Sequence, residues 1–341
     1  MFTTPLIRAL RRRFPEAHLT YLVEPTAASV LRDNPHLNDI LVVPRRQGAA
    51  RLLDDLAMAR RLRRERFDVA IDLHGGPRAA WFAWSSGAPT RIGYTIAGRR
   101  WMYTHVVPRA SDLAPRHSVL NQCDLLGPLG IEACDPATDP VEMTDDPAVG
   151  ARVDRRLREA GIGPEHALVL IHVSAGNPFR RWPADSFAAL AAALARRDPT
   201  RRVILVSGPS EREAAAAVAE AARARLGPSA DAVSAGEYDL AELRALSARA
   251  AVYIGGDSGP LHIAATTDAP IVALLGPTLG ERSRPWRDPR RVSEVVDAGP
   301  LPCRPCQQRH CVPGDFRCLT GISAEHVIAA AERAMDRGSV R

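Results

Sequence analysis

Short apolar runs alternate with Ala- and Arg-rich stretches of helical period along most of the chain. This alternation is typical of repeated β-strand and α-helix units, in which helices cover both faces of a parallel sheet. In the first half we predict strands over 19–23, 40–43, 69–73 and 105–107, and helices near 4–13, 48–66, 77–86 and 117–128. In the second half we predict strands over 167–173, 202–207, 251–255 and 271–275. The sequence therefore predicts an α/β fold.

A looser segment rich in Asp, Pro and Thr, over 133–147, interrupts the pattern and is predicted to connect two domains. A chain of 341 residues also exceeds the size at which one hydrophobic core keeps growing. We therefore predict two Rossmann-like domains, over 1–147 and 148–341. The sequence of residues 2–14 predicts a helix that would be the first helix of such a domain, but no strand-like run precedes it. The first domain is therefore expected to lack its first strand and the ligand-binding turn that would follow it.

The basic residues exclude several enzyme classes. All 45 of them are arginine, because the sequence contains no lysine. A Walker A loop, a protein kinase and a Schiff-base or pyridoxal phosphate enzyme each need a lysine. The net charge of +6 suits anionic partners. Aromatic residues make up only 5% of the chain, and no basic patch is interleaved with stacking rings, so we expect no nucleic-acid binding.

The sequence offers no candidate for a membrane span. Its longest uninterrupted apolar stretch, over 187–195, falls far short of the roughly 20 residues that a span needs. The first residues also lack the basic start, apolar middle and small-residue cleavage site of a signal peptide. We therefore expect a cytoplasmic protein without a transmembrane segment, in which the cysteines stay reduced.

The most specific motif covers 252–262 and has the sequence VYIGGDSGPLH. A buried strand is predicted to end at the two glycines, Ser258 or Gly259 can cap the next helix, and the proline suits its first turn. Free amides at the start of a helix bind anions, so this motif predicts a diphosphate site. Asp257 could orient the loop or a ribose hydroxyl, and His262 could reach a phosphate. The alternative is a plain helix cap with a packed histidine.

A second loop follows the first predicted strand of the same half, over 172–183. Its small residues, Ser174 and Gly176 among them, would let the backbone approach a ligand closely. The Arg180 guanidinium suits phosphate oxygens on which a leaving group builds charge. Two solvated arginines on a turn are the alternative. Glu211 follows the next predicted strand, where its carboxylate could hold sugar or ribose hydroxyls, or simply favour the helix dipole.

Together these motifs resemble those of glycosyltransferase family 9, the ADP-heptose:lipopolysaccharide heptosyltransferases. The match runs over nearly the whole length, and the segment 257–262 carries most of its specificity. Further matching segments are 3–10 with Phe14 and Pro15, 72–76 with Arg78, 91–94, 180–183 and 275–278. The family usually has lysine where Arg180 stands, a change that keeps the charge. The resemblance implies the GT-B architecture, in which two Rossmann-like domains face a cleft.

By this resemblance the first domain binds the acceptor and the second binds the nucleotide-sugar donor. The donor would be bound by Ser174, Gly176, Arg180, Glu211, Asp257, Ser258, Gly259, His262, Gly276 and Thr278. Of these, Gly276 and Thr278 would lie near the nucleotide. His74 and Arg78 would contact the acceptor, although a helix cap and a surface arginine are the alternative reading of those two residues.

The reaction that the resemblance implies is inverting transfer of a heptose from ADP-heptose to a lipopolysaccharide core acceptor, without a metal or other catalytic cofactor. The glycolipid acceptor would place the protein at the surface of the inner membrane. Family members carry a Gly-Asp pair shortly before the helix that matches 3–10, and its aspartate is the expected general base. We expect that aspartate to be encoded upstream of Met1, and the chain without it to be inactive or nearly so.

Because the expected aspartate is not in the sequence, other interpretations remain open. Asp72 and Glu24 are possible substitutes for the base, although each is better explained as a strand-end residue. The alternative function is a nucleotide-sugar-binding protein that has lost catalysis. A dinucleotide-dependent oxidoreductase is disfavoured, because no G-x-G-x-x-G motif follows a predicted strand.

Four cysteines are grouped in a Pro- and Arg-rich segment near the C-terminus. They are Cys303, Cys306, Cys311 and Cys318. In a reducing compartment such a group favours structural zinc ahead of an iron–sulfur cluster, with free thiols and disulfides as the alternatives. Similar clusters occur in part of family 9, nearer to heptosyltransferase II than to heptosyltransferase I. Cys123 and Cys134 stand apart and are expected to be ordinary reduced residues, buried or partly exposed.

Overall fold

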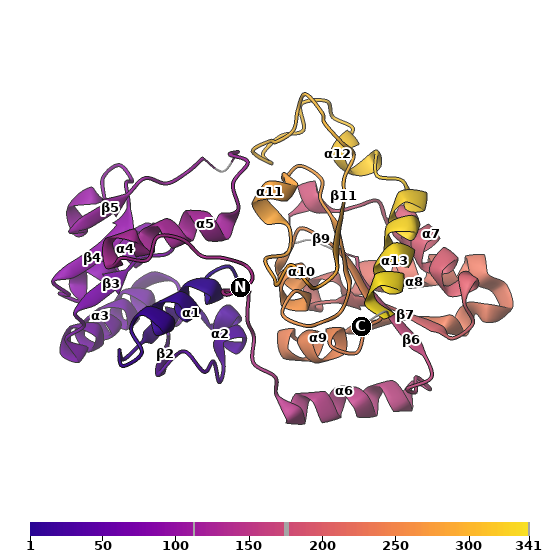
Figure 1. Cartoon of the computed structure of the whole chain (residues 1–341), viewed down its shortest axis with the longest axis horizontal. Coiled ribbons are helices and arrows are strands. Elements are labelled where there is room, and N and C mark those ends of the chain that lie inside the picture. The colour runs from indigo at the N-terminus through magenta and orange to yellow at the C-terminus, as the bar shows by residue number, and fades with distance from the viewer. Residues whose placement is uncertain (112, 174–176, 340–341) are drawn as a thin grey trace. The chain divides into compact units, whose positions relative to one another are not determined.

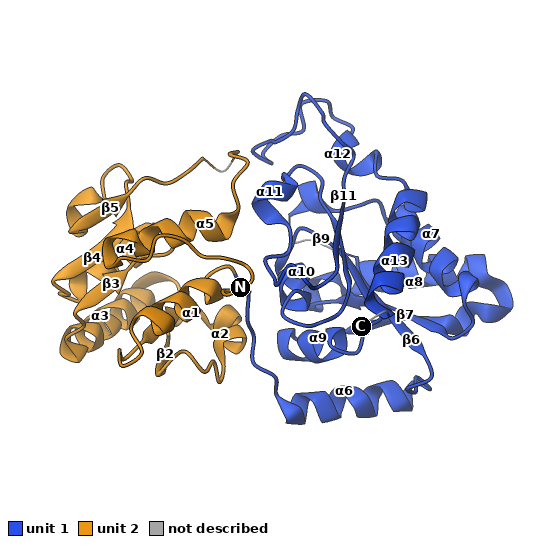
Figure 2. Cartoon of the chain, in the orientation of Figure 1, with its two compact units in different colours: residues 1, 141–341 blue, residues 2–140 orange. Residues whose placement is uncertain are grey.

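The computed structural model describes residues 1–111, 113–173 and 177–339. The chain separates into two compact units, shown in Figure 2. The N-terminal unit consists of residues 2–140, and the C-terminal unit of residue 1 with 141–341.

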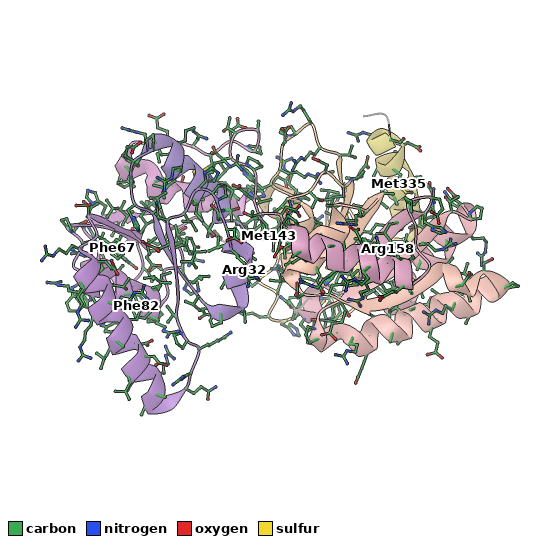
Figure 3. The ribbon with its side chains drawn as sticks, turned by 90° about the horizontal axis from the view of Figure 1, so that it is seen from below. Arg32, Phe67, Phe82, Met143, Arg158 and Met335 are labelled. Carbon is green, nitrogen blue, oxygen red and sulfur yellow. A yellow bond between two sulfur atoms is a disulfide. The ribbon has the colours of Figure 1, made fainter. Side chains whose placement is uncertain are left out.

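The division lies a few residues before the predicted boundary at 147, because the segment after residue 140 is bonded to the C-terminal unit. The Val141 amide donates to the Trp286 carbonyl at 3.0 Å. The Arg244 guanidinium donates to the carbonyl of Met143, which is labelled in Figure 3, at 2.8 Å. The predicted connection at 133–147 thus belongs partly to each unit.

The C-terminal unit is built on one parallel sheet of six strands in the order β11-β10-β9-β6-β7-β8 (Figure 1). The strands are β6 (Ala167–His172), β7 (Arg201–Ser207), β8 (Val233–Glu237), β9 (Val252–Gly256), β10 (Ile271–Leu274) and β11 (Ser293–Val296). The chain runs outward from β6 to β8 on one side of the sheet and from β9 to β11 on the other. This reversal of strand order between β6 and β9 is the Rossmann topology, as predicted.

Helices and short 3-10 turns connect these strands. The helices are α6 (Pro147–Glu159), α7 (Ala184–Arg197), α8 (Arg212–Leu226), α9 (Leu240–Ser247), α10 (Gly259–Ala264), α11 (Gly280–Ser283), α12 (Arg317–Thr320) and α13 (Ala324–Ser339). The 3-10 turns are η3 (Pro178–Arg180), η4 (Pro209–Glu211) and η5 (Gly227–Ala232). Helices α7, α8 and α13 share one core with the strands, to which β6 contributes Val169 and Ile171. Leu168 and Leu170 are also buried, as a central strand covered on both faces requires.

The N-terminal unit contains two separate parallel sheets, one of β1-β2 and one of β3-β4-β5. The strands are β1 (Thr20–Val23), β2 (Asp39–Val42), β3 (Val69–Ile71), β4 (Thr90–Tyr94) and β5 (His105–Val107). Within the described residues no strand joins the two sheets.

Five helices and two 3-10 turns surround these sheets. The helices are α1 (Thr4–Arg13), α2 (Pro25–Leu31), α3 (Gly48–Glu65), α4 (Pro77–Ser85) and α5 (Ser118–Cys123), and the turns are η1 (Arg100–Met102) and η2 (Asp124–Leu129). Phe82 of α4 packs with Leu62 of α3 and Leu41 of β2, and Phe67 borders this cluster; Figure 3 labels both phenylalanines. Among the described helices, none has the length and apolar character needed to cross a membrane.

The cysteines of the N-terminal unit correct one expectation. Cys123 and Cys134 form a disulfide, with their Cα atoms 6.1 Å apart, so the expectation of two ordinary reduced residues was wrong. The turn that follows α5 brings the two buried side chains together at a separation that a disulfide can span. Spacing in the sequence gave no sign of this turn.

Candidate functional site

The carboxyl ends of β6 and β9 lie side by side where the strand order reverses. The two strands pair directly, with Leu170 opposite Tyr253 and His172 opposite Gly255. The loop after β6 contains Arg180, and the turn after β9 leads into α10. In open α/β sheets the crevice at such a reversal is where ligands bind. Both loops that carry the sequence motifs therefore lie where the sheet topology favours a ligand-binding site.

An ion pair connects the two loops. The Arg180 Nη1 lies 3.0 Å from Oδ2 of Asp257 and also donates to the Asp257 carbonyl at 3.2 Å. The Arg180 side chain is 31% exposed and the Asp257 side chain 4%, so the arginine can still meet a ligand. A Cβ on Gly256 would lie 3.1 Å from the Arg180 carbonyl, which explains why glycine ends this strand. The guanidinium is thus fixed to the end of β9.

Asp257 is ionised although it is buried. Burial by itself would raise its pKa, but the neighbouring His262, the charge of Arg180 and a hydrogen bond from the Ser283 hydroxyl outweigh it and lower the pKa of Asp257 to about 2. A carboxylate with so low a pKa is a poor proton acceptor at neutral pH. Asp257 therefore positions its neighbours in this structure, and its predicted contact with a ribose hydroxyl stays a prediction.

His262 lies on the other side of the same carboxylate. Its Nε2 is 3.8 Å from Oδ1 of Asp257, beyond hydrogen-bonding distance. Burial lowers the pKa of His262, against the opposite influence of Asp257. The imidazole is therefore neutral at pH 7. A neutral imidazole can still donate one N–H to a phosphate oxygen.

Helix α10 begins as the motif predicts. Ser258 has the extended backbone of an N-cap, at φ −152° and ψ 167°, and Pro260 lies in the first turn. The Ser258 hydroxyl donates to the Gly256 carbonyl at 3.2 Å, and its oxygen accepts no hydrogen bond from the helix amides. Because α10 has only six residues, its dipole is small. The backbone amides from Gly259 onward, and not the dipole, are what this turn can offer an anion.

Gly276 and Thr278 follow β10 at the same end of the sheet. A Cβ on Gly276 would lie 2.6 Å from the Leu319 side chain, so the glycine permits close packing of α12. The Thr278 carbonyl accepts a hydrogen bond from Arg304 at 3.0 Å. Both residues are buried, Gly276 next to Leu319 and Thr278 next to Arg304. Their predicted contact with the nucleotide stays a prediction.

Another predicted donor residue, Glu211, has a position that the local turn explains. Glu211 ends η4 after β7, one strand away from the reversal, and its carboxylate lies beside Gly208. Its amide donates to the Gly208 carbonyl at 3.1 Å, which closes the turn. Ser174 and Gly176 lie outside the described residues.

The four C-terminal cysteines are free thiols of intermediate burial. Burial, and then the neighbouring thiols of Cys306, Cys303 and Cys311, raise the pKa of Cys318 to about 11. The cysteine side chains are therefore close enough to influence one another. Among the described residues, however, no three His, Cys, Asp or Glu side chains are arranged to hold one metal ion.

The segment 303–318, which we call the cysteine loop, also reaches the candidate donor site. The Gln308 Oε1 accepts hydrogen bonds from the Asn177 amide at 2.9 Å and from the Arg180 Nε at 2.7 Å. The Gln308 Nε2 donates to the Thr278 hydroxyl at 3.3 Å. Sequence reasoning missed Gln308, and its only signal was its place between two of the clustered cysteines.

In the N-terminal unit, the loops after β3, β4 and β5 surround a cavity of about 670 Å³. His74 lines it, together with Arg99 and Arg109, which sequence reasoning missed. Both arginines follow strands of the same sheet, but β4 was not among the predicted strands. Arg99 donates to the Gly75 carbonyl, and Arg109 donates to the His74 carbonyl at 3.4 Å. The described lining residues include no acid, so this cavity suits an anionic ligand.

The conformation of His74 explains the glycines after it. The His74 Nδ1 accepts a hydrogen bond from the Gly76 amide at 3.0 Å, and a Cβ on Gly76 would lie 2.5 Å from that nitrogen. Gly75 has a φ of +75°, and a Cβ there would meet Ile96 at 2.7 Å. The motif at 74–76 therefore holds an exposed imidazole at the cavity.

Arg78 is placed differently from His74. Its Nε donates to Asp55 at 2.9 Å, and its Nη2 donates to the Pro44 carbonyl at 3.0 Å. The guanidinium also lies over the Phe82 ring, 5.5 Å from its centroid. It is not among the described residues that line the cavity. These contacts give Arg78 a role in joining α4 to α3.

The two carboxylates considered as substitutes for the general base differ in environment. Asp72 is buried and accepts hydrogen bonds from the His74 amide at 2.9 Å and the Tyr103 hydroxyl at 2.6 Å. It therefore shapes the turn after β3. Glu24 directly follows β1 and is the N-cap residue of α2; its carboxylate is 50% exposed and 3.8 Å from Arg45.

Known proteins resemble this chain over most of its length. The model of glycosyltransferase family 9 (heptosyltransferase) matches residues 56–315. Lipopolysaccharide heptosyltransferase 3 of Escherichia coli is 28% identical over 340 residues, which cover 98% of this chain and 95% of the relative.

Solved structures agree on the fold. A glycosyl transferase family 9 protein of Veillonella parvula has a TM-score of 0.80 at 22% identity, covering 98% of this chain and 92% of its own. The E. coli ADP-heptose lps heptosyltransferase II has a TM-score of 0.75 at 18% identity, covering 99% and 95%. The predicted GT-B architecture and family are confirmed. Because the family model matches well over half of its residues, the chain belongs to glycosyltransferase family 9 and is a glycosyltransferase.

Proposed function

We propose that this glycosyltransferase moves a heptose from ADP-heptose to a lipopolysaccharide core acceptor, with inversion at the anomeric carbon. The observation that carries the proposal is the Arg180–Asp257 pair at the reversal of strand order, beside His262 and the amides of α10. The relatives named above support the choice of sugar and acceptor, because their names specify lipopolysaccharide and, for heptosyltransferase II, ADP-heptose.

The donor diphosphate would lie between Arg180 and the start of α10. During transfer the bond from the anomeric carbon to the diphosphate oxygen breaks, and negative charge builds up on ADP. The Arg180 guanidinium, the neutral His262 N–H and backbone amides at the start of α10 would stabilise that charge. These groups supply what a metal ion supplies in other nucleotide-sugar enzymes, so we propose that catalysis needs no metal cofactor.

The acceptor would bind in the basic cavity of the N-terminal unit. His74, Arg99 and Arg109 line it, and a lipopolysaccharide core carries phosphate and carboxylate groups that guanidinium groups bind well. A general base must take the proton of the attacking acceptor hydroxyl. Arg99 and Arg109 would orient that hydroxyl rather than deprotonate it, because an arginine side chain stays charged at any physiological pH.

A transfer assay tests this proposal. The protein is incubated with ADP-heptose and a heptose-bearing core glycolipid, and the products are analysed by mass spectrometry and by measuring ADP release. We expect any sugar that the glycolipid gains, even at low turnover, to be one heptose from ADP-heptose, and UDP- and GDP-sugars to be poor donors. Turnover of a UDP- or GDP-sugar in preference to ADP-heptose would refute the donor assignment. The anomeric configuration of the product, measured by NMR, tests inversion separately.

We also propose that the cysteine loop binds one structural zinc ion. Four thiolates are a donor set that zinc prefers, and all four cysteines are free. Burial and the neighbouring thiols raise the pKa of Cys318, and a bound zinc ion would lower it, because zinc binds the deprotonated thiol. The thiols would have to move closer together, since the described residues show no ready coordination geometry. Elemental analysis of protein purified without chelator should give about one zinc per chain; a ratio near zero removes this proposal.

A further inference from the structure

An apolar patch lies on the surface of the N-terminal unit. We call it the Leu/Trp patch, and it consists of Leu52, Leu53, Leu56, Trp84 and Trp101. The exposed fractions of these side chains are 65%, 68%, 43%, 44% and 62%. Nine large apolar side chains are exposed in the described part of the chain, and five of them belong to this patch. Single exposed apolar residues are ordinary, but a contiguous group marks an interaction surface.

The patch is continuous across three elements. Leu52, Leu53 and Leu56 share one face of α3, because residues three and four apart lie on the same side of a helix. Leu56 and Trp84 line one groove of about 480 Å³. Trp84 of α4 meets Trp101 of η1, with ring centroids 5.7 Å apart.

Arginines surround the apolar residues. Arg60 and Arg63 lie on the same face of α3 as the leucines, and both line the groove together with Arg91. The described lining residues of this groove include no acid. The acids of α3 are each close to another arginine: Arg46 Nε lies 3.5 Å from Asp54, Arg51 Nε 3.6 Å from Asp55 and Arg61 Nε 3.8 Å from Glu65. The groove therefore keeps a positive charge.

We propose that the Leu/Trp patch docks on an anionic lipid membrane surface. Leucine and tryptophan side chains favour the interface between headgroups and acyl chains, and flanking arginines bind lipid phosphates. A second copy of the chain fits less well, because a two-fold interface would bring the same arginines against each other. Docking is independent of the donor site, so it does not depend on the proposed function.

Vesicle co-sedimentation tests the proposal. We expect the full chain to pellet with vesicles that contain phosphatidylglycerol and to stay in solution with pure phosphatidylcholine. The double variant Leu52→Ser/Leu53→Ser should bind about tenfold or more weakly, because two exposed apolar side chains leave the interface. Val312→Ser is the matched control: Val312 is 82% exposed in the C-terminal unit, and its loss should leave binding unchanged.

Three results would overturn the assignment. One is failure of the wild-type chain to pellet with anionic vesicles. Another is unchanged vesicle binding of the double variant. The third is a wild-type dimer in analytical ultracentrifugation that becomes monomeric in the double variant, because the patch would then bind a second copy. Thermal unfolding of the double variant should be close to that of the wild type, since both leucines are exposed.

A second inference rests on a different observation, the hydrogen bonds of Gln308. Its amide group has one orientation that fits its neighbours: the oxygen faces two N–H donors, from Asn177 and Arg180, and the nitrogen faces the Thr278 hydroxyl. A flipped amide would oppose N–H to N–H on the first side. The Gln308 backbone has a φ of +56°, a conformation uncommon for any residue with a side chain. The cysteine loop thus holds this side chain in a specific place.

The cysteine loop is attached to the same corner at other points. Arg304, whose side chain is 6% exposed, pairs with Asp297 at 2.7 Å and donates to the Thr278 carbonyl. The Phe316 ring packs on the Phe179 ring, with centroids 5.4 Å apart. These contacts join the loop to the segments after β6, β10 and β11. Movement of the loop would therefore move the neighbours of Arg180.

We infer that Gln308 is a positioning residue for Arg180. Gln308 holds the Nε of the guanidinium and Asp257 holds its Nη1, so two contacts fix the direction of the remaining nitrogen, Nη2. This inference rests on the proposed function, because it assumes that Arg180 binds the donor diphosphate. Without Gln308 the guanidinium would keep its charge and lose its direction.

Calorimetric titration with ADP tests the positioning role of Gln308 separately from diphosphate binding by Arg180. Gln308→Leu and Gln308→Gly should each weaken ADP binding about fivefold, because the Arg180 guanidinium loses the hydrogen bond that directs it. Gln308→Gly should keep or raise the melting temperature, because glycine suits the positive φ. Gln307→Leu changes the exposed neighbour and should bind ADP like the wild type.

The results of these titrations distinguish failure of the positioning role from failure of the proposed function. If Gln308 variants bind ADP like the wild type while Arg180→Met binds weakly, the positioning role is refuted and the proposed function stands. If affinity falls only in a variant that also loses stability, Gln308 has a structural role alone and the inference is refuted. If the wild-type chain does not bind ADP, the proposed function and this inference both fail.

Discussion

Replacement of Asp257 by asparagine should destabilise the C-terminal unit by a calculable amount. The pKa of Asp257 is about 2 in the folded protein, against an ordinary value of 3.8. A downward shift of this size corresponds to roughly 2 to 3 kcal/mol of folding free energy at neutral pH. Asparagine has the same shape but places a neutral amide where the Arg180 guanidinium needs a negative charge. We therefore expect Asp257→Asn to lower the free energy of unfolding by about 2 to 3 kcal/mol at pH 7.

The pH dependence follows from the direction of the shift. A folded pKa below the unfolded one means that the carboxylate stabilises the fold fully above pH 3.8, and that this contribution is lost as the pH falls towards 2. The difference between wild type and Asp257→Asn should therefore be constant from pH 7 to about pH 5 and shrink below pH 4. Urea unfolding, followed by circular dichroism at each pH, measures it.

Asp154→Asn is the control for this experiment. Asp154 also pairs with an arginine, Arg249, but its side chain is 40% exposed, so its loss should change stability by less than about 1 kcal/mol. The reasoning is refuted if Asp257→Asn is as stable as the wild type at pH 7. It is equally refuted if the difference stays constant down to pH 3.

Further substitutions test single parts of the account. Arg180→Met should weaken ADP binding about 10- to 150-fold by calorimetry, the effect of losing charge-assisted hydrogen bonds, whereas Arg181→Met at the exposed neighbour should have little effect. Arg99→Ala and Arg109→Ala should each raise the KM for the acceptor and leave the dissociation constant of ADP unchanged; an effect on ADP alone would contradict the acceptor role of the cavity. Gly276→Ala should lower stability by about 1 to 3 kcal/mol in urea unfolding, because a methyl group there meets the side chain packed from α12 at 2.6 Å; a neutral effect would mean that α12 is free to shift.

The central strands of the C-terminal unit were predictable because burial on both faces requires uninterrupted apolar residues. β6 and β9 meet that condition, and their carboxyl ends carry the donor motifs. The edge strands β8 and β11 are partly exposed and include Gly and Glu, so their sequences lack such a run. β4 is the central strand of its sheet, but Thr90 and Arg91 begin it and Gly93 interrupts it, so its sequence also lacks an apolar run.

Contacts between residues distant in sequence were beyond prediction. The ion pair of Arg180 with Asp257 joins residues 77 positions apart, and the hydrogen bond of Arg180 with Gln308 joins residues 128 apart. Only the folded sheet brings the ends of β6, β9 and β11 to one edge. The Cys123–Cys134 disulfide likewise depends on the turn after α5, which no pattern in the sequence marks.

A crystal structure of the protein with ADP tests the central claim most directly. We expect the diphosphate oxygens within hydrogen-bonding distance of the Arg180 guanidinium and of the amides that follow Ser258. ADP bound elsewhere, with water or buffer beside Arg180 and the start of α10, would contradict the assignment of the donor site.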